Sequence, residues 1–390
     1  MKFLKEDILK VYKTNPIEES LLVFQSEGNT NQYIEYAIIK IEGYRLTESD
    51  IRYWIDSIDR LKDCYLFEYE TPLRIRLRNS FYPIWMSKKD ESLTVDEVAD
   101  YLANIPMPFD VQKPPLYRVE IIETPECQFF CLIYHHLLFD GISVQLALSN
   151  LDRTKQISFS DWNPSRKDIT ILKQEIKPFL LEGYVPPTNQ NKEGYYRQEF
   201  SLAGISYETV MRQWVNYLRM ISGQEEVVIG EVFSARDSSI DAATALGYFV
   251  QAWPLVFHGE VTEVKLKEVR SHIISISDGY IKDYFSQNSF DQCWVVEPFL
   301  NTEFETSFYS TPHYLLTIIF KPKADALSIT FCWNLLKIDQ VAAMEIGKGF
   351  IASLEKEHDL NLSENKFELV DQSLLDRWDE VVEKNPNKIA

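Results

Sequence analysis

Residues 135–141 read HHLLFDG and hold the side chains of this chain that are best suited to chemistry. Histidine titrates near neutral pH, so a fixed imidazole can accept a proton from a reacting amine or hydrogen-bond to that amine. The two histidines follow an apolar run, Phe129–Tyr134, that predicts a buried strand. Successive side chains of an extended segment point to opposite faces, so one imidazole can face a cleft while the other packs inward. The residues alone leave open which of His135 and His136 faces the cleft.

Asp140 and Gly141 turn the chain after the histidines, because glycine permits backbone angles that other residues resist. Two roles are open for Asp140: it fixes the loop geometry through an ion pair, or it only forms the turn. Ser143 follows near the start of a predicted helix, and we favour a helix N-cap for it over a hydroxyl of the site. The segment thus combines one reactive imidazole with side chains that shape the turn.

Apolar periodicity predicts the elements that position this segment. The predicted strands cover Tyr33–Ile41, Leu73–Arg78, Tyr117–Ile122, Phe129–Tyr134, Glu226–Phe233, Leu246–Phe257, Gln292–Glu297, Tyr314–Lys321 and Ala326–Trp333. The predicted helices cover Glu48–Leu61, Thr94–Ile105, the chain from Ser143 onward, Tyr207–Met220, Glu263–Ile276 and Asp339–Glu355, and Thr47 is the expected cap of the first. Because helices and strands are mixed in both halves, we predict an α/β (α+β) fold.

A length of 390 residues predicts two lobes. The periodic pattern breaks around residues 159–167, so we place the N-terminal lobe, which carries the HHLLFDG segment, at residues 1–165. The C-terminal lobe then covers residues 166–365. Residues 366–390 are polar and read as a linker or the start of a following domain.

The formal net charge of −19 argues against nucleic-acid binding, whose affinity comes mainly from Lys and Arg on phosphates. The N-terminus lacks the apolar core of a signal peptide, and no stretch approaches the roughly 20 apolar residues of a membrane span. We therefore expect a cytoplasmic protein without a membrane partner.

The remaining motifs support neither a metal nor a nucleotide. The five cysteines, Cys64, Cys127, Cys131, Cys293 and Cys332, are scattered without a ligand pair that completes a zinc site, so we expect buried free thiols. The chain contains no P-loop, no GxGxxG and no GxSxG, which argues against nucleotide binding and against a serine hydrolase.

The HHxxxDG pattern, together with further segments, makes nearly the whole chain similar to the condensation domains of nonribosomal peptide synthetases, members of the chloramphenicol acetyltransferase-like superfamily. The similar segments are Asn15–Leu22, Pro108–Asp110, Pro115–Val119, Phe159–Trp162, Ser222–Gly230 with Arg236 downstream, Leu246–Leu255, Trp333–Asn334 and, leading into an adenylation domain, Leu375–Ala390. The HHxxxDG pattern alone also occurs in related acyltransferases, so the further segments narrow the choice.

The resemblance implies two chloramphenicol acetyltransferase-like lobes in a V-shaped pseudodimer with a central tunnel. It also implies amide-bond formation between a donor thioester and an acceptor amine. Both substrates would arrive on the 4'-phosphopantetheine of donor and acceptor peptidyl carrier proteins, and the domain itself would bind no cofactor. An adenylation domain would follow in the same polypeptide. If Met1 is the natural start, the domain would open its polypeptide. It would then be either a starter type with an acyl-CoA or acyl-carrier donor or a domain that receives a peptide from a separate upstream protein.

One segment departs from the family pattern. Residues 59–67 read DRLKDCYLF where the family has R-H-E-x-L-R-T, so the family's arginines and histidine are missing or displaced. We therefore expect Asp140 to pair with Arg236, although Arg236 can also be read as a solvated surface charge. Within the resemblance, His136 carries the chemistry and His135 has a structural role. Ser143 and Tyr248 become candidates for lining the tunnel, although packing is the simpler reading of Tyr248.

Two further functions compete with condensation. The first is a stand-alone, coenzyme A-dependent acyltransferase, which the adenylation-like tail argues against. The second is a catalytically degenerate condensation fold that serves as a carrier-protein recruitment platform. The altered segment at residues 59–67 favours the platform, and the intact HHLLFDG segment disfavours it.

Overall fold

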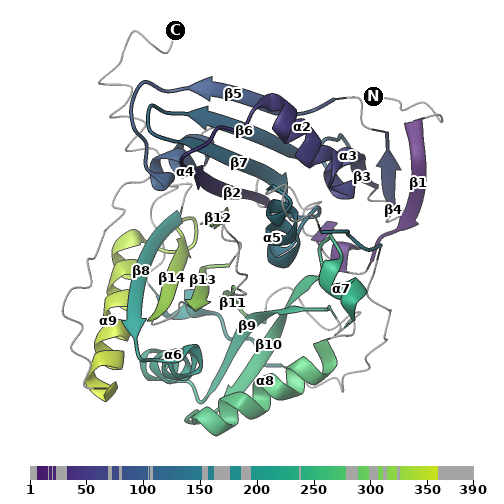
Figure 1. The fold of residues 1–390 in the computed structure, drawn as a ribbon. Helices are drawn as coiled ribbons and strands as arrows, with labels where there is room; N and C mark the ends of the chain where they lie inside the picture. Colours follow the sequence, from purple (N-terminus) through teal and green to yellow (C-terminus); the bar gives the residue numbers. More distant parts are fainter. Residues whose placement is uncertain are drawn as a thin grey trace. The chain divides into compact units, whose positions relative to one another are not determined.

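The computed structural model describes residues 7–15, 17–19, 21–22, 33–68, 73–78, 81–103, 105, 109–151, 157–161, 176–185, 195–236, 239–277, 289–297, 306–310, 314–322 and 326–358. The chain divides into two compact units (Figure 1). Unit 1 comprises Met1–Arg166, Ala235–Val250 and Leu300–Thr311, and unit 2 comprises Lys167–Ser234, Gln251–Phe299 and Pro312–Ala390. Unit 1 thus takes two segments from the second half of the sequence. The linker expected at residues 366–390 lies outside the described residues.

Unit 1 contains a five-stranded sheet that carries the HHLLFDG segment. Its strands, in sheet order, are β12 (Thr306–Ser310), β2 (Ile34–Ile41), β7 (Gln128–His135), β6 (Tyr117–Glu123) and β5 (Ile84–Lys88). The pairs are antiparallel, apart from the parallel pair of β5 and β6. Every residue of β7 is buried, as expected for a continuous apolar run with a neighbour on each side.

A smaller three-stranded sheet lies in the same unit. Its order is β1 (Ile8–Lys13), β4 (Leu73–Leu77) and β3 (Cys64–Glu68), with antiparallel pairing throughout. The strand predicted here is present, but its burial does not alternate strictly: Arg74 and Leu77 are buried, and the other three residues of β4 are half-buried.

Four helices of unit 1 bear on the site. They are α2 (Glu48–Asp56), α3 (Asp59–Lys62), α4 (Val95–Ala103) and α5 (Gly141–Ser149). The predicted cap of α2 is confirmed: Thr47 and Asp50 form a reciprocal capping box. The indole nitrogen of Trp54 donates to the carbonyl of Ala147 at 2.8 Å, which ties α2 to α5. The helix that starts after the HHLLFDG turn is therefore fixed against another helix of its own unit.

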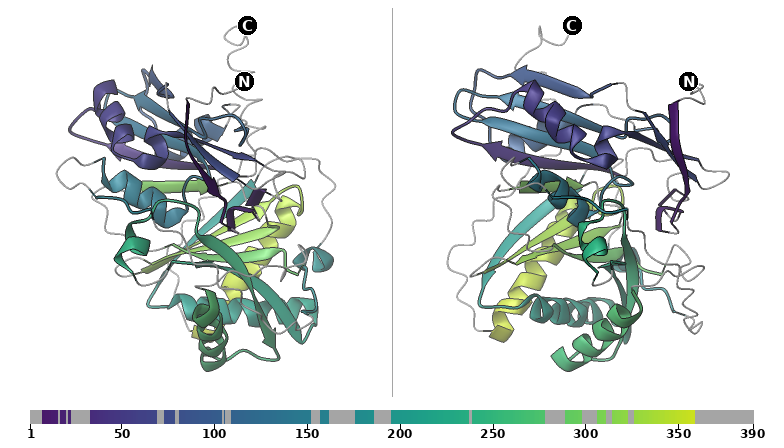
Figure 2. Two further views of the ribbon diagram at one scale, coloured as in Figure 1. Left: turned by 90° about the vertical axis from the view of Figure 1, so that its right-hand side faces the viewer. Right: turned by 45° about the vertical axis from the view of Figure 1, so that its right-hand side comes forward.

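Unit 2 is a six-stranded sheet with helices against it, and Figure 2 shows it from two further sides. The strand order is β10 (Val250–His258), β9 (Glu226–Ser234), β11 (Gln292–Val296), β13 (Leu316–Pro322), β14 (Ala326–Asn334) and β8 (Tyr195–Ala203). Helix α6 (Tyr207–Ser222) packs beside α8 (Glu263–Ser277) and α9 (Gln340–His358). Trp214 of α6 is fully buried among aromatic rings from β14 and α9.

The predicted α/β class is confirmed, two predicted elements need correction, and several strands were missed. The helix expected over Glu48–Leu61 breaks at Ile58, whose extended backbone separates α2 from α3. The strand expected from Leu246 begins only at Val250 and follows an unpredicted short helix, α7 (Ile240–Thr244). The strands β1, β3, β5, β8 and β12 were not predicted. None of the helices in the described ranges is long and apolar enough to cross a membrane.

Candidate active site

The two histidines stand where β7 gives way to a turn. His135 is the last residue of β7, and His136 opens the turn that leads to α5. The backbone nitrogen of His135 donates to Leu116 and that of His136 donates to Tyr33, each at 2.8 Å. These acceptors precede the two strands that flank β7. The position of the reactive segment is therefore fixed from both sides by main-chain hydrogen bonds.

The two imidazoles have different surroundings. The His135 side chain is fully buried, and its Nδ1 accepts a hydrogen bond from the backbone nitrogen of Leu137 at 3.1 Å. The His136 side chain is 17% exposed. This contrast agrees with the expectation that one histidine packs inward while the other is available to a substrate.

The ring of His136 is oriented by two contacts. Its Nδ1 lies 2.8 Å from the carbonyl oxygen of Phe139, and because a carbonyl only accepts, Nδ1 carries the proton. The neutral ring then has its lone pair on Nε2. The ring of Tyr248 packs edge-on against the imidazole with 4.7 Å between ring centroids. His136 is thus held in the tautomer in which Nε2 accepts.

A carboxylate lies beside that nitrogen. The Oε1 atom of Glu35, on β2, is 3.9 Å from Nε2 of His136, and Oε2 accepts a hydrogen bond of 3.3 Å from the hydroxyl of Tyr134. The register of β2 against β7 places Glu35 opposite Tyr134 and so brings its carboxylate to the site. The sequence analysis did not identify Glu35, because that register cannot be read from either strand alone.

Asp140 is a fully buried carboxylate with several donors around it. It caps α5 by accepting from the backbone nitrogen of Ser143 at 2.7 Å, and it accepts from the backbone nitrogen of Phe249 at 3.2 Å. Nη2 of Arg236 lies 3.2 Å from its Oδ1 atom. The expected pair of Asp140 and Arg236 is therefore present. Asp140 thus links the start of α5 to residues 235–250, a segment of unit 1 from the second half of the sequence.

Arg236 and Ser143 complete this network. Arg236 donates from Nη1 to the carbonyls of Ala242 and Ala245 and from Nη2 to the hydroxyl of Ser143 at 2.7 Å. The Ser143 hydroxyl in turn donates to the carbonyl of Gly247 at 2.8 Å and accepts from its nitrogen at 3.0 Å. The N-cap expected for Ser143 is therefore wrong, because Asp140 occupies that position. Ser143 is also fully buried, so it presents no surface for lining a tunnel.

Gly141 does not need the conformational freedom of glycine. It is the first residue of α5 and is not among the glycines with positive φ. A Cβ atom built on it would meet no atom within 4 Å. The expectation that the turn depends on glycine backbone angles is therefore wrong, because the turn is made by His136, Leu137 and Leu138.

The expectation of buried free thiols is confirmed for the five cysteines. All five thiols are buried and free, and burial raises the pKa of the Cys131 and Cys293 thiols, which keeps them protonated. Within the described part of the chain, no group of three or more His, Cys, Asp or Glu residues is placed to hold a metal ion. The chemistry that the described residues offer at this site is proton transfer and hydrogen bonding by His136 and Glu35.

Comparison with known proteins relates the chain to large synthetases. No family model matches it. Gramicidin S synthase 2 of Brevibacillus brevis is 20% identical over 489 aligned residues, which cover 100% of this chain and 11% of that protein. Surfactin synthase subunit 1 of Bacillus subtilis (strain 168) is 24% identical over 234 residues, which cover 50% of this chain and 6% of that protein. The chain therefore spans only a small part of the length of these curated relatives.

Three solved structures with a similar fold are condensation domains. The first condensation domain of the CDA synthetase has a TM-score of 0.69 at 12% identity, with 89% of this chain and 96% of that chain covered. The starter condensation domain of rhizomide synthetase has a TM-score of 0.68 at 14% identity, covering 88% and 94%. The condensation domain of a monacolin K polyketide synthase has a TM-score of 0.68 at 9% identity, covering 90% and 98%. The chain therefore has the fold of the condensation domains of nonribosomal peptide synthetases.

Proposed function

We propose that this chain forms an amide bond between a donor acyl or aminoacyl thioester and the amine of an acceptor aminoacyl thioester. The observation that carries the proposal is the placement of His136, whose Nε2 atom is the proton-accepting nitrogen of a partly exposed, oriented imidazole. A histidine in that state suits a reaction in which an attacking amine loses a proton.

The substrates would come on the 4'-phosphopantetheine arms of donor and acceptor peptidyl carrier proteins, and an adenylation domain would follow in the same polypeptide. Support comes from the sequence relatives, which are peptide synthetases such as gramicidin S synthase 2. The rhizomide relative is a starter condensation domain in complex with C8-CoA, which supports an acyl donor as one alternative to a peptidyl donor.

In the proposed reaction the acceptor nitrogen attacks the thioester carbonyl carbon. The C–N bond forms, the C–S bond breaks, and the thiol leaves. Nε2 of His136 hydrogen-bonds the amine or takes its proton, and the proton ends on the departing sulfur. The Phe139 carbonyl, at 2.8 Å from Nδ1, favours the ring with its proton on Nδ1 and stabilises the imidazolium that forms when Nε2 is protonated.

Glu35 has a separate part in the proposed mechanism. An acceptor α-amine is partly protonated near neutral pH, since the ordinary pKa of such a group is about 7.7–8.0. The Glu35 carboxylate, 3.9 Å from Nε2 of His136, is close enough to bind the ammonium form next to the imidazole. It would thereby concentrate the acceptor nitrogen at the position from which it attacks.

Asp140 and Arg236 act as positioning residues in this proposal. Asp140 caps α5 and is linked to the backbone of Phe249, whose neighbour Tyr248 packs on the ring of His136. Arg236 neutralises the buried carboxylate, so the turn keeps its geometry without an uncompensated charge.

The test is intact-protein mass spectrometry of amide formation between loaded donor and acceptor carriers, with wild type and His136→Ala. We expect product with wild type and a loss of about 10²–10⁴-fold in the variant. His258→Ala is the matched control, because His258 is 69% exposed and bound to Glu226 in unit 2. It should keep the wild-type rate.

Three other outcomes would contradict part of the proposal. Equal rates for wild type and His136→Ala would remove the histidine from the reaction. Turnover with a coenzyme A donor and a free amine or alcohol, but not with carriers, would favour the stand-alone acyltransferase. Carrier binding without turnover across a panel of donors would favour the recruitment platform.

A further inference from the structure

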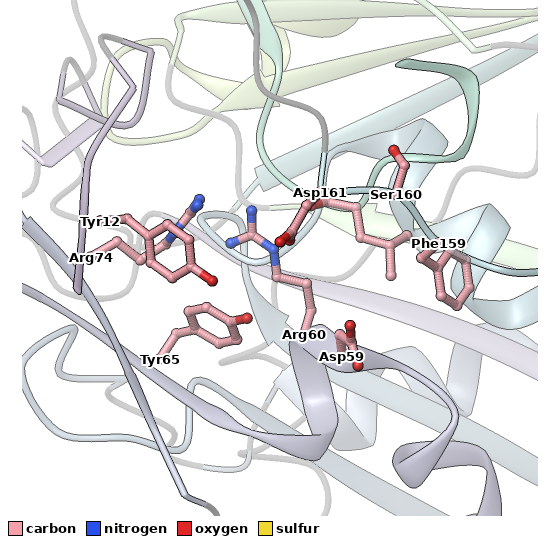
Figure 3. A pocket seen from close by; sticks show the side chains of 9 residues that line it. Tyr12, Asp59, Arg60, Tyr65, Arg74, Phe159, Ser160 and Asp161 are labelled. Atoms are coloured by element: carbon pink, nitrogen blue, oxygen red, sulfur yellow. The ribbon is translucent and has the colours of Figure 1, made fainter. Parts of the chain in front are cut away.

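A second polar site lies in unit 1, in a pocket that neither His135 nor His136 lines (Figure 3). The three-stranded sheet, the start of α3 and residues 157–161 contribute to its walls. The rings of Tyr12 and Tyr65 and the side chains of Arg60 and Arg74 face it. Phe159 and Leu246 also line it. The proposed reaction uses none of these side chains.

Arg74 is a buried cation with one carboxylate partner. Its side chain is 5% exposed, and Nη1 donates to Oε1 of Glu18 at 2.6 Å. The guanidinium lies over the ring of Tyr12, 4.8 Å from the centroid. Its Nε atom is buried and has no hydrogen-bond partner. One donor of this guanidinium is therefore unused in the structure.

Arg60 is buried to a similar degree, and no carboxylate of the described residues forms an ion pair with it. Its exposed fraction is 7%, and Nε donates to the carbonyl of Leu246 at 2.9 Å. The guanidinium lies 5.1 Å from the ring centroid of Tyr65, and its Nη1 atom is buried without a hydrogen-bond partner. Unpaired donors of this kind are rare in native interiors and call for an explanation.

The buried part of the pocket holds two cations, Arg60 and Arg74, and one carboxylate, Glu18. Glu18 is the one buried carboxylate that the described residues bring against the two arginines. Burial, together with the neighbouring charge of Arg74, lowers the pKa of Arg60 to about 10, so Arg60 remains charged at neutral pH. A net positive charge therefore stays buried, which is costly unless an anion accompanies it.

The acidic residues at the rim do not supply that anion. Asp59 and Asp161 also line the pocket, but their side chains are 64% and 83% exposed. Asp59 lies 4.0 Å from Arg76, and Asp161 lies 4.0 Å from Lys10. These carboxylates are solvated and have other cations nearby, so their effect on the buried floor is screened.

We propose that this pocket binds a small oxyanion, a phosphate or carboxylate group, between Arg60 and Arg74. The oxygens of such a group can accept from the unused Nη1 and Nε donors, and guanidinium groups match both anions in geometry. The aromatic walls formed by Tyr12 and Tyr65 would lower the local dielectric constant and strengthen these bonds. The proposal is independent of the reaction at His136.

The experiment is thermal unfolding of the full chain in potassium phosphate, sulfate or acetate against potassium chloride, all at one ionic strength. We expect a saturable rise in the melting temperature of a few degrees with the oxyanion that fits. The phosphate and acetate arms distinguish a phosphate group from a carboxylate group. Equal ionic strength removes the general screening that any salt gives to a chain of net charge −19.

Arg60→Met should abolish the rise, whereas Arg76→Met should keep it. Arg76 shares β4 with Arg74 but pairs with Asp63 and does not line the pocket, which makes it a matched control. An equal rise in wild type and Arg60→Met, or no rise with any oxyanion, would overturn the proposal. If Arg60→Met does not fold, anomalous diffraction from wild-type crystals in selenate decides: a peak between the two guanidiniums supports the site, and its absence refutes it.

Discussion

The two adjacent histidines differ in the exposure of their side chains, although they are one residue apart. The same side chain is fully buried at His135 and partly exposed at His136. Strand alternation predicted that the two rings differ, although His136 already lies in the turn after β7 and packs against the distant Tyr248. The preference for protonation on Nδ1 needs the Phe139 carbonyl, which returns to the ring only through the folded turn.

A substitution of Glu35 tests whether this residue binds the ammonium form of the acceptor or only supports the structure around His136. Glu35→Gln should slow condensation about tenfold or more with an ordinary α-amine acceptor at neutral pH, because the amide cannot take up the ammonium charge. The loss should shrink as the pH rises, and it should be absent with a weakly basic aminooxy acceptor. Single-turnover rates across pH would check this. An equal loss with both acceptors would point instead to a disturbed His136.

Gly141 gives a prediction with two readouts. Gly141→Ala should raise the free energy of unfolding by about 0.4–1 kcal/mol, because the helical backbone suits alanine and the position is open. Urea unfolding measures this effect. If the variant is more stable but condenses slowly, the missing side chain serves substrate approach rather than folding. A less stable variant would contradict the structural interpretation of this position.

At the scale of elements, the sequence predicted those whose periodicity is uninterrupted, such as β7 and α6. It missed the break between α2 and α3 because Ile58 and Leu61 are fully buried and continue the helical apolar spacing across the break. The part of the candidate active site that lies within residues 135–141 was predicted from the sequence. Glu35 reaches the site because of the register between β2 and β7, and Arg60 is held by a hydrogen bond to the carbonyl of Leu246, far away in the sequence. The place of neither residue can therefore be predicted from a local pattern.

A glycine of β9 illustrates an element-level constraint. A Cβ atom on Gly230 would lie 2.2 Å from the ring of Phe290, so Gly230→Ala should destabilise unit 2 by about 1–3 kcal/mol through overpacking. Urea unfolding is the measurement. Gly183→Ala is the control, because a Cβ there meets no atom within 4 Å. Equal effects of the two substitutions would show that the ring moves away at little cost.

The whole molecule carries a formal net charge of −19, and like charges repel more strongly in a compact state. The melting temperature should therefore rise as sodium chloride increases from about 10 mM to about 0.3 M, because the screening length falls from about 30 Å to below 10 Å. Differential scanning calorimetry would measure the rise, and potassium chloride should reproduce it. A flat or falling profile would mean that local ion pairs outweigh the net repulsion.

The two late segments of unit 1 have a consequence for synthesis on the ribosome. Arg236, the partner of Asp140, lies in residues 235–250, and β12, which covers the edge of β2, ends at Ser310. A nascent chain of the first 166 residues would hold a buried carboxylate without its cation and an open sheet edge. At roughly 5–20 residues per second, the histidine-bearing half waits about 7–30 s after residue 166 before its last strand is made. Maturation of this half is therefore coupled in time to translation of the other.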